Sequence, residues 1–367
     1  MAPCYNETRK TEIGADMNAE SLVSSFKDGM AKLSRAERQR AIESVQGVIR
    51  AALFDDSAGE QQGPRCCPRC GSVDFVKKGR NADGTHRHLC KDCGRTFGAK
   101  SERILGNTKL PKETWMAYAE CFVLMLPLRE CADRCGVCLK TAFTMRHRLI
   151  ECLTAFSPAF GVASGCGCEL DETYFAENFK GNHTLGTFEL PRPARHRGGC
   201  LHLRGLSGEQ ICVMTGINDS GDSLLEVSGR GTLSKKRAVE FLKGRIEEGS
   251  VVATGKARAY PSALRELGVA AHKAYDSKDR SKGTINRVNN VHAMLASFMT
   301  GSRGVSTKHL QAYLGWFTWH RSFARSGTRA AEPVVARQIA NGLCRTRIRD
   351  MFNVYPPFME YWGKRAA

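Results

Sequence analysis

The sequence lacks the long apolar runs that a membrane span or a secretion signal needs. Its longest apolar run, near Phe122 to Leu128, is far shorter than the roughly 20 residues of a transmembrane helix. Residues 1–16 are polar and charged, and contain no apolar core of the kind found in signal peptides. We interpret them as a disordered tail. These absences predict a cytoplasmic protein without a membrane partner.

Internal repeats and low-complexity blocks are also missing from the 367 residues. This excludes a solenoid or another repeat architecture. A chain of this length with 42% hydrophobic residues can bury an ordinary core and is expected to form two or three domains.

Acidic residues are few beside basic ones, with 37 Asp and Glu against 55 Lys and Arg and a net charge of +18. A field of this sign favours a polyanionic partner such as nucleic acid, although a solubilising surface has the same composition. The 16 cysteines come without a secretion signal, so reduced thiols and a metal site are favoured over a disulfide framework.

Two Cys-x-x-Cys pairs lie within residues 64–98 and predict a zinc ribbon. Each pair can form a tight turn, and two such turns complete a tetrahedral thiolate shell for structural Zn²⁺. The predicted ligands are Cys67, Cys70, Cys90 and Cys93. Cys66 is an alternative ligand, whereas His86 and His88 are expected to face solvent or DNA. The basic residues of the ribbon either contact phosphates or are simply solvated: Lys77, Lys78, Arg80, Arg87, Lys91 and Arg95.

Residues 106–156 have the layout of a helix-turn-helix. A short helix over Leu128 to Arg134 is followed by a turn at Gly136 and by a second helix from about Leu139. A recognition helix lies in the major groove with its N-terminal residues at the base edges. The residues predicted to read bases are Lys140, Thr141 and Thr144, and those predicted to contact phosphates are Arg146 and Arg148. The alternative is an ordinary helical hairpin with a charged face.

The remaining segments predict an α+β multidomain chain. Residues 17–54 are expected to form two helices, the second opened by a capping box of Ser34 and Glu37, and residues 55–63 a linker. Within 160–325, three strand-like runs precede alternating helices and strands, which predicts a mixed sheet with helices on both faces. Residues 326–367 are basic and aromatic. They are expected to pack onto the preceding domain, with nucleic-acid contact as the alternative.

Several strings in one order, spread over about residues 64–325, resemble the transposases of zinc-ribbon-bearing insertion sequences. They are CPRCGS, LCKDCGRTF, ECADRCGVCLKTAFTMRHRL, ELDETYF, RGLSGEQICVM, INRVNNVH and GVSTKHLQAYLGWF. The resemblance implies an RNase H-like catalytic domain. It also implies Mg²⁺-dependent cleavage and transfer of DNA strands, with an oligomer acting on terminal inverted repeats and target DNA.

The resemblance also implies where the catalytic residues lie. Asp171, in the middle of an apolar strand, corresponds to the first metal-binding Asp, and Asn289 corresponds to a third ligand at the start of a late helix. His292 lies on the same helical face as Asn289, within reach of a substrate phosphate, and Asn290 replaces Asn289 if the register is shifted by one. Along the strand, Glu169 shares the side of Asp171, and Glu172 points the other way.

One departure from the family pattern matters most. The second metal-binding Asp is expected directly after the strand VVAT, and this chain has Gly255 there, with no Asp or Glu from Gly249 through Arg265. A Lys expected two helical turns after Asn289 is replaced by Ala296. The sequence therefore predicts a transposase whose catalysis is impaired. The alternative is a transposase-derived DNA-binding protein or repressor without catalysis.

Overall fold

The computed structural model describes residues 19–38, 40–41, 64, 66–82, 84–98, 101, 103–105, 108–182, 188–192, 205–276, 284–325, 335, 337–339 and 342–366. The chain divides into two compact units, Met1–Asp56 and Ser57–Ala367. No helix in these described ranges is long and apolar enough to cross a membrane.

The first unit contains helix α1 (Ala19–Ala31) and the start of a second helix after Ser34. The predicted capping box is present. The Ser34 hydroxyl donates to Glu37 Oε2 at 2.6 Å, the Ser34 backbone N–H donates to the same oxygen at 2.9 Å, and the Glu37 N–H lies 3.4 Å from Ser34 Oγ. Reciprocal bonds of this kind satisfy backbone donors that a helix start leaves unpaired. The predicted tail, residues 1–16, lies outside the described residues.

The second unit begins with a three-stranded antiparallel sheet in the order β1 (Phe75–Arg80), β2 (His86–Cys90) and β3 (Thr96–Gly98). A helical segment follows, with α3 (Lys112–Val123), α4 (Leu128–Arg134) and α5 (Leu139–Thr154). Gly136 makes the turn between α4 and α5 with φ of 62°, a backbone conformation that glycine adopts at little cost. The predicted positions of both helices and of the turn are confirmed.

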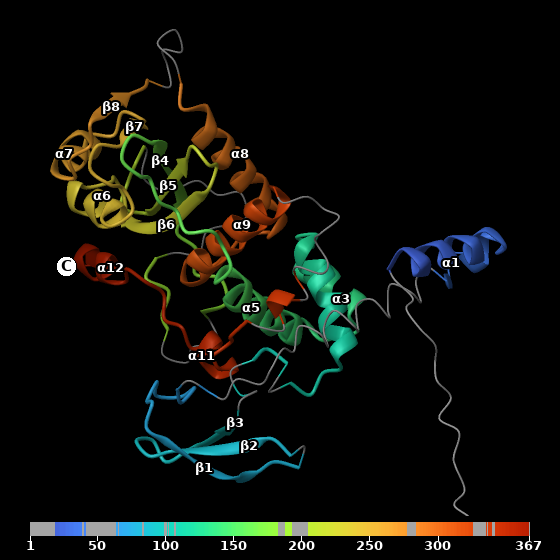
Figure 1. Cartoon of the computed structure of the whole chain (residues 1–367). Coiled ribbons are helices and arrows are strands. Elements are labelled where there is room, and N and C mark those ends of the chain that lie inside the picture. The colour runs from blue at the N-terminus through green and yellow to red at the C-terminus, as the bar shows by residue number, and fades with distance from the viewer. Residues whose placement is uncertain are drawn as a thin grey trace, which may run out of the picture. The chain divides into compact units, whose positions relative to one another are not determined.

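A five-stranded mixed sheet forms the body of the second unit (Figure 1). Its strands are β4 (Gly167–Ala176), β5 (Gln210–Asn218), β6 (Ser223–Arg230), β7 (Val251–Thr254) and β8 (Ala271–Ala274). They lie in the order β6-β5-β4-β7-β8. The first three strands in the chain pair antiparallel, whereas β4 with β7 and β7 with β8 pair parallel. The predicted mixed sheet is therefore confirmed, and β4 is its central strand.

Helices cover both faces of this sheet, as the alternation of sequence segments predicts (Figure 1). On one face, α6 (Lys235–Leu242) and α7 (Ala259–Glu266) share an apolar core with Leu170 of β4 and Met214 of β5. On the other face lie α8 (Asn286–Gly301) and α9 (Leu310–Arg325), the latter preceded by a short 3-10 helix, Thr307–His309. Gln311 of α9 accepts the Val227 N–H at 2.8 Å and donates to the Leu225 carbonyl at 3.2 Å.

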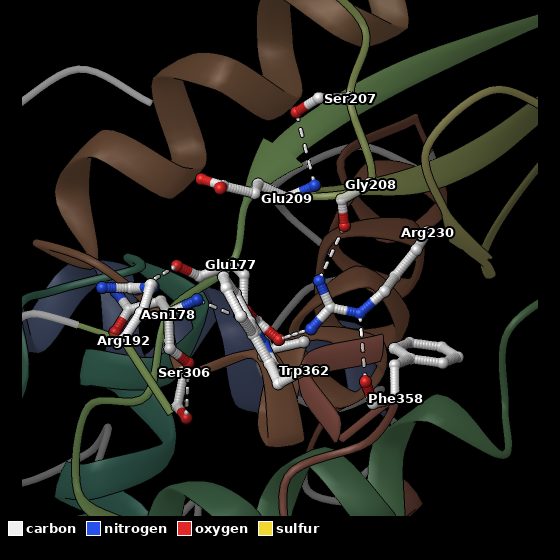
Figure 2. A network of polar contacts seen from close by, with 11 residues as sticks. Glu177, Asn178, Arg192, Ser207, Gly208, Glu209, Arg230, Ser306, Phe358 and Trp362 are labelled. Atoms are coloured by element: carbon white, nitrogen blue, oxygen red, sulfur yellow. Dashed lines mark hydrogen bonds and ion pairs between the residues drawn. The ribbon is translucent and has the colours of Figure 1, made fainter. Parts of the chain in front are cut away.

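The C-terminal segment contains α11 (Ile348–Phe352) and α12 (Glu360–Ala366). It forms hydrogen bonds to a buried ion pair whose two partners lie at the ends of sheet strands (Figure 2). Glu177, just beyond β4, pairs with Arg230 at the end of β6. The Trp362 indole N–H donates to Glu177 Oε2 at 2.8 Å, and the Arg230 guanidinium donates to the Phe358 carbonyl at 3.2 Å. These contacts confirm that C-terminal aromatic residues pack onto the preceding domain.

We expect Trp362→Phe to lower the free energy of unfolding by about 2 kcal/mol, because it removes a hydrogen bond to a buried carboxylate. Chemical denaturation measures the loss. Tyr355→Phe is the matched control, since Tyr355 is exposed and should change stability by less than about 0.5 kcal/mol. Equal stability of the two variants would contradict the role of the indole N–H.

Candidate functional site

The four predicted cysteines of the ribbon form a group that can hold a metal ion such as Zn²⁺. Their sulfur atoms all lie within 4.8 Å of one another. Cys67 Sγ lies 3.7 Å from Cys93 Sγ, and Cys70 Sγ lies 3.5 Å from Cys90 Sγ. A tetrahedral site with Zn–S bonds of about 2.3 Å has S···S edges of about 3.8 Å, so the donor set fits zinc. An ion held by these four ligands would have no open position for a substrate.

One histidine of the ribbon has a different place from the one predicted. His88 is buried between Phe75 and Phe97, with ring centroids 5.4 and 5.7 Å away. It therefore belongs to the small core of the ribbon and does not face solvent. His86 and the basic side chains of β1 are exposed, as predicted.

Three of the five side chains predicted to contact DNA are buried. Thr144, Arg146 and Arg148 expose 9%, 2% and 7% of their surface, so the prediction that they contact bases or phosphates is wrong for this fold. Thr144 donates its hydroxyl to the Lys140 carbonyl at 3.0 Å. Lys140 is exposed and Thr141 is partly exposed at the start of α5, and their contact with DNA stays a prediction.

The two arginines are buried because α5 is covered on several sides. The Arg146 guanidinium donates to the Leu126 carbonyl at 2.7 Å and lies over the Trp316 ring of α9 at 5.1 Å. Arg148 Nε lies 3.3 Å from Cys344 Sγ in the C-terminal segment. Both arginines therefore connect α5 to its neighbours within the protein, and their charge is not presented to a ligand.

A cleft of about 670 Å³ opens where β7 and β8 end and α8 begins. Its lining contains two of the predicted catalytic residues, Asp171 and Asn289. It also contains Gly255, the position where the resemblance implies an Asp. The other lining residues are Lys256, Tyr275, Asp276, Thr284, Ile285 and Asn286. Residues more than a hundred positions apart in the chain thus meet in one cleft.

Asp171 is largely buried in this cleft, and within the described residues no lysine or arginine forms an ion pair with it. Burial, and next the charge of Glu172, raise the pKa of Asp171 from 3.8 to about 7. His292, on α8, has its Nδ1 4.0 Å from Asp171 Oδ2. Burial lowers the pKa of His292 to about 4, so the imidazole is neutral at physiological pH and does not form an ion pair with Asp171.

Glu169 shares the side of Asp171 on β4 but anchors the start of α8. Its two carboxylate oxygens accept the Arg287 Nε–H and the Val288 backbone N–H, both at 3.0 Å. Arg287 also donates to Asp219 Oδ1 at 2.9 Å. This network positions the first turn of α8, and with it Asn289. Glu172 points to the opposite side, where it accepts the Tyr260 hydroxyl at 2.9 Å.

Gly255 directly adjoins the Asp171 carboxylate. Its backbone N–H lies 3.3 Å from the Leu170 carbonyl, and a Cβ built on Gly255 would lie 2.4 Å from Asp171 Oδ1. Any side chain at this position would therefore converge with Asp171. The pairing of Leu170 with Thr254 in the parallel β4–β7 ladder produces this approach.

The acidic residues that line the cleft do not fit a pair of Mg²⁺ ions. Asp276 is the second carboxylate of the lining, and Lys256 Nζ pairs with it at 2.8 Å. That leaves Asp171 as one carboxylate, with the neutral amide of Asn289 as a further oxygen donor. Mg²⁺ needs several hard oxygen ligands in octahedral geometry, and two adjacent ions share carboxylates. Gly255, which lies beside Asp171, contributes no anionic group to this lining.

The sequence interpretation missed Lys256, Tyr275 and Asp276. Tyr275 and Asp276 directly follow β8, and Lys256 follows Gly255 after β7. Because parallel strands end at the same edge of a sheet, these residues meet Asp171 once the β7–β8 pairing is known. The signal was weak since β8 is only four residues long.

We expect the purified protein to contain an equimolar amount of zinc and Cys90→Ser to lose it, because three thiolates cannot close the shell. Elemental analysis of the purified proteins measures the metal. Cys166→Ser, at an exposed cysteine outside the group, should keep the full zinc content. Retention of zinc by Cys90→Ser would exclude this ligand set.

We expect Asp171→Asn to melt at a higher temperature than the unmodified protein at pH 8, with the difference vanishing near pH 4. The folded pKa of Asp171, about 7, lies above its unfolded value. Ionisation therefore destabilises the fold increasingly as pH rises from about 4 to 7, by at most about 1.4 kcal/mol for each pH unit. Thermal melts in Mg²⁺-free buffer measure this. A difference independent of pH would contradict it.

No model of a known protein family matches the chain. A curated relative is an uncharacterized protein in the transposable element ISH50 of Halobacterium salinarum. It is 26% identical over 278 residues, which cover 73% of this chain and 90% of the relative. Among solved structures, the chain resembles one from the simian T-cell lymphotropic virus intasome in complex with the PP2A regulatory subunit B56 gamma. That match has 12% identity, covers 55% of this chain and 67% of the other, and has a TM-score of 0.26, too low to inform fold or function.

Proposed function

We propose that this chain is a DNA-binding transposase of the insertion-sequence type whose own catalytic site is impaired at Gly255. The protein would bind the terminal inverted repeats of its element through the zinc ribbon and the exposed start of α5, around Lys140 and Thr141. It would act there as a homo-oligomer on paired ends. The relative encoded in a transposable element supports this origin.

The order of the strands supports an RNase H-like catalytic domain. The family places one Asp on the first strand, a second after the fourth strand, and an Asn or Glu at the start of a late helix. In this sheet, Asp171 lies on the first strand, β4, and Gly255 follows the fourth strand, β7. Asn289 lies in the first turn of α8 and borders the same cleft.

The close approach of position 255 to Asp171 is the observation that carries the proposal. A Cβ built there would lie 2.4 Å from Asp171 Oδ1, so once the Asp171 side chain turns aside, a carboxylate at position 255 would lie next to it and the two could share a cation. Glycine leaves that place without a ligand. An alternative function, a non-catalytic regulator that occupies the ends of its element, is favoured by the same glycine.

We expect Gly255→Asp to gain Mg²⁺-dependent nicking of DNA that carries the terminal repeats. A restored anionic ligand would raise the rate about a thousandfold, which corresponds to about 4 kcal/mol of transition-state stabilisation. Gly255 does not have a positive φ, and the atom nearest to the new Cβ is the far end of the Asp171 side chain. A small rotation of Asp171 therefore makes room.

Gly255→Asn is the matched control, because it adds the same shape without the charge, and it should remain as slow as the unmodified protein. Initial rates on labelled duplexes measure all three. If the unmodified chain nicks as fast as Gly255→Asp, the second ligand lies elsewhere. If no variant nicks while the repeats are bound, the regulator function stands.

A further inference from the structure

The C-terminal segment contacts the zinc ribbon before it enters α11. The Arg345 guanidinium donates to Cys66 Sγ at 3.7 Å, and Cys66 directly precedes the predicted metal ligand Cys67. Leu343 forms an isolated antiparallel bridge with Arg103, just beyond the ribbon. The residues before α11 and the start of the ribbon therefore adjoin each other.

The same segment is also attached to α5, at two places. Glu151 accepts the backbone N–H groups of Arg345 and Thr346 at 2.7 and 3.0 Å. At the exposed start of α5, Lys140 Nζ lies 5.2 Å from the ring centroid of Phe352, the last residue of α11. Residues 343–352 therefore connect the ribbon with the start of α5, the two elements through which the proposed function binds DNA.

Five arginines gather where the segment meets the ribbon, two from the ribbon and three from the segment. This arginine surface consists of Arg69, Arg95, Arg345, Arg347 and Arg349. Four of the five are exposed, and Arg347 is half-buried. Arg69 of the ribbon interacts electrostatically with Arg347 and Arg349 of the segment, so positive charges from distant parts of the chain act on one another. Their mutual repulsion favours a ligand of the opposite charge.

Acidic residues neutralise little of this charge. Asp350 is the one acidic residue in 343–352, and its carboxylate lies 3.9 Å from Arg347 Nε and 3.3 Å from Arg349 Nε. The two arginine side chains are 39% and 67% accessible, and ion pairs exposed to this degree contribute little to stability. Both guanidinium groups can therefore turn to another anion at small cost.

A duplex backbone is the anion that suits an extended surface of this kind. It presents phosphates at regular intervals along a stiff rod, and a guanidinium binds phosphate oxygens through two parallel N–H bonds. Arginines on the ribbon and along residues 343–352 can contact successive phosphates, whereas a single small anion would occupy only one or two of them.

From this arrangement we infer that residues 343–352 are a third DNA-binding element, which contacts the phosphate backbone between the ribbon and the start of α5. The inference rests on the proposed function, since it takes DNA as the ligand. It adds a contact that is independent of base sequence, because phosphate contacts position a protein on DNA and base contacts specify the site.

The test measures how the affinity of the full chain for DNA depends on salt. Fluorescence anisotropy gives the dissociation constants for a duplex with the terminal repeat and for an unrelated duplex, over a range of NaCl concentrations. Each lost phosphate contact lowers the slope of log K against log[salt] by about 0.9. We expect Arg345→Gln combined with Arg349→Gln to lower the slope by about 1.8, and to weaken binding of both duplexes about tenfold or more.

Two further double variants make the comparison specific. Lys236→Gln combined with Arg265→Gln removes two exposed charges from α6 and α7, outside the arginine surface, and should bind as the unmodified protein does. Arg345→Lys combined with Arg349→Lys keeps the charge and should keep the slope, because an ammonium also pairs with a phosphate.

The zinc content of each variant checks that the ribbon is intact, since Arg345 contacts Cys66. If the double Gln variant loses zinc, Arg349→Gln alone takes its place, with an expected fall in slope of about 0.9.

The outcomes separate the two proposals. An unchanged slope in the Gln variant, or an equal fall in the variant of α6 and α7, overturns the role of residues 343–352 and leaves the transposase function intact. Weaker binding of the repeat alone also overturns it, because phosphate contacts do not distinguish sequences. The expected fall on both duplexes, in a protein without preference for the repeat, keeps the arginine surface and contradicts recognition of the repeats.

Discussion

The parallel pairing of β4 with β7 is the constraint on which the cleft depends. It aligns Leu170 with Thr254 and thereby brings position 255 against the Asp171 carboxylate. The same central strand presents Glu169 and Asp171 to α8, and Glu172 to α7. A shift of this ladder by one residue would turn each of these carboxylates to the opposite face. The apolar core beneath the sheet, which contains Leu170, Val252 and Tyr260, opposes such a shift.

Glu169 and Asp171 both present a carboxyl group from β4, but their surroundings differ. Glu169 satisfies a backbone N–H at the start of α8 and an arginine, so its charge is compensated inside the protein. Asp171 has no arginine or lysine paired with it within the described residues, and burial raises its pKa. A buried carboxyl without a cationic partner is costly, and such groups concentrate at functional sites. The cleft thus has the electrostatic character of a ligand site, with a buried carboxyl facing Gly255.

Much of the fold follows from local patterns in the sequence. The turn at Gly136, the capping box at Ser34 and the strand containing Asp171 all lie where spacing and composition predict them. The four ribbon cysteines converge as their spacing predicts. Each of these features depends on neighbours only a few residues away, or on a rule for metal ligands that is independent of the fold.

Apart from the burial of His88 inside the ribbon, the errors concern contacts between distant segments. The basic face of α5 indicates DNA contact, but Trp316 and Cys344 cover Arg146 and Arg148 from parts of the chain more than 150 residues away. The partner of Glu169 is 118 residues away, so its anchoring role is invisible in the strand itself. A helix with charge on one side predicts exposure only when nothing else packs there, and a single sequence does not contain that information.

Gly255 also has a consequence for the history of such a gene. The sheet, the helix anchor of Glu169 and the apolar core are all in place with glycine at this position, because the strand pairing that brings it beside Asp171 does not depend on its side chain. Glycine codons GGT and GGC differ from aspartate codons by a single base. On the proposed function, a gene that uses either codon is one base change away from an aspartate beside Asp171, with the surrounding scaffold already in place.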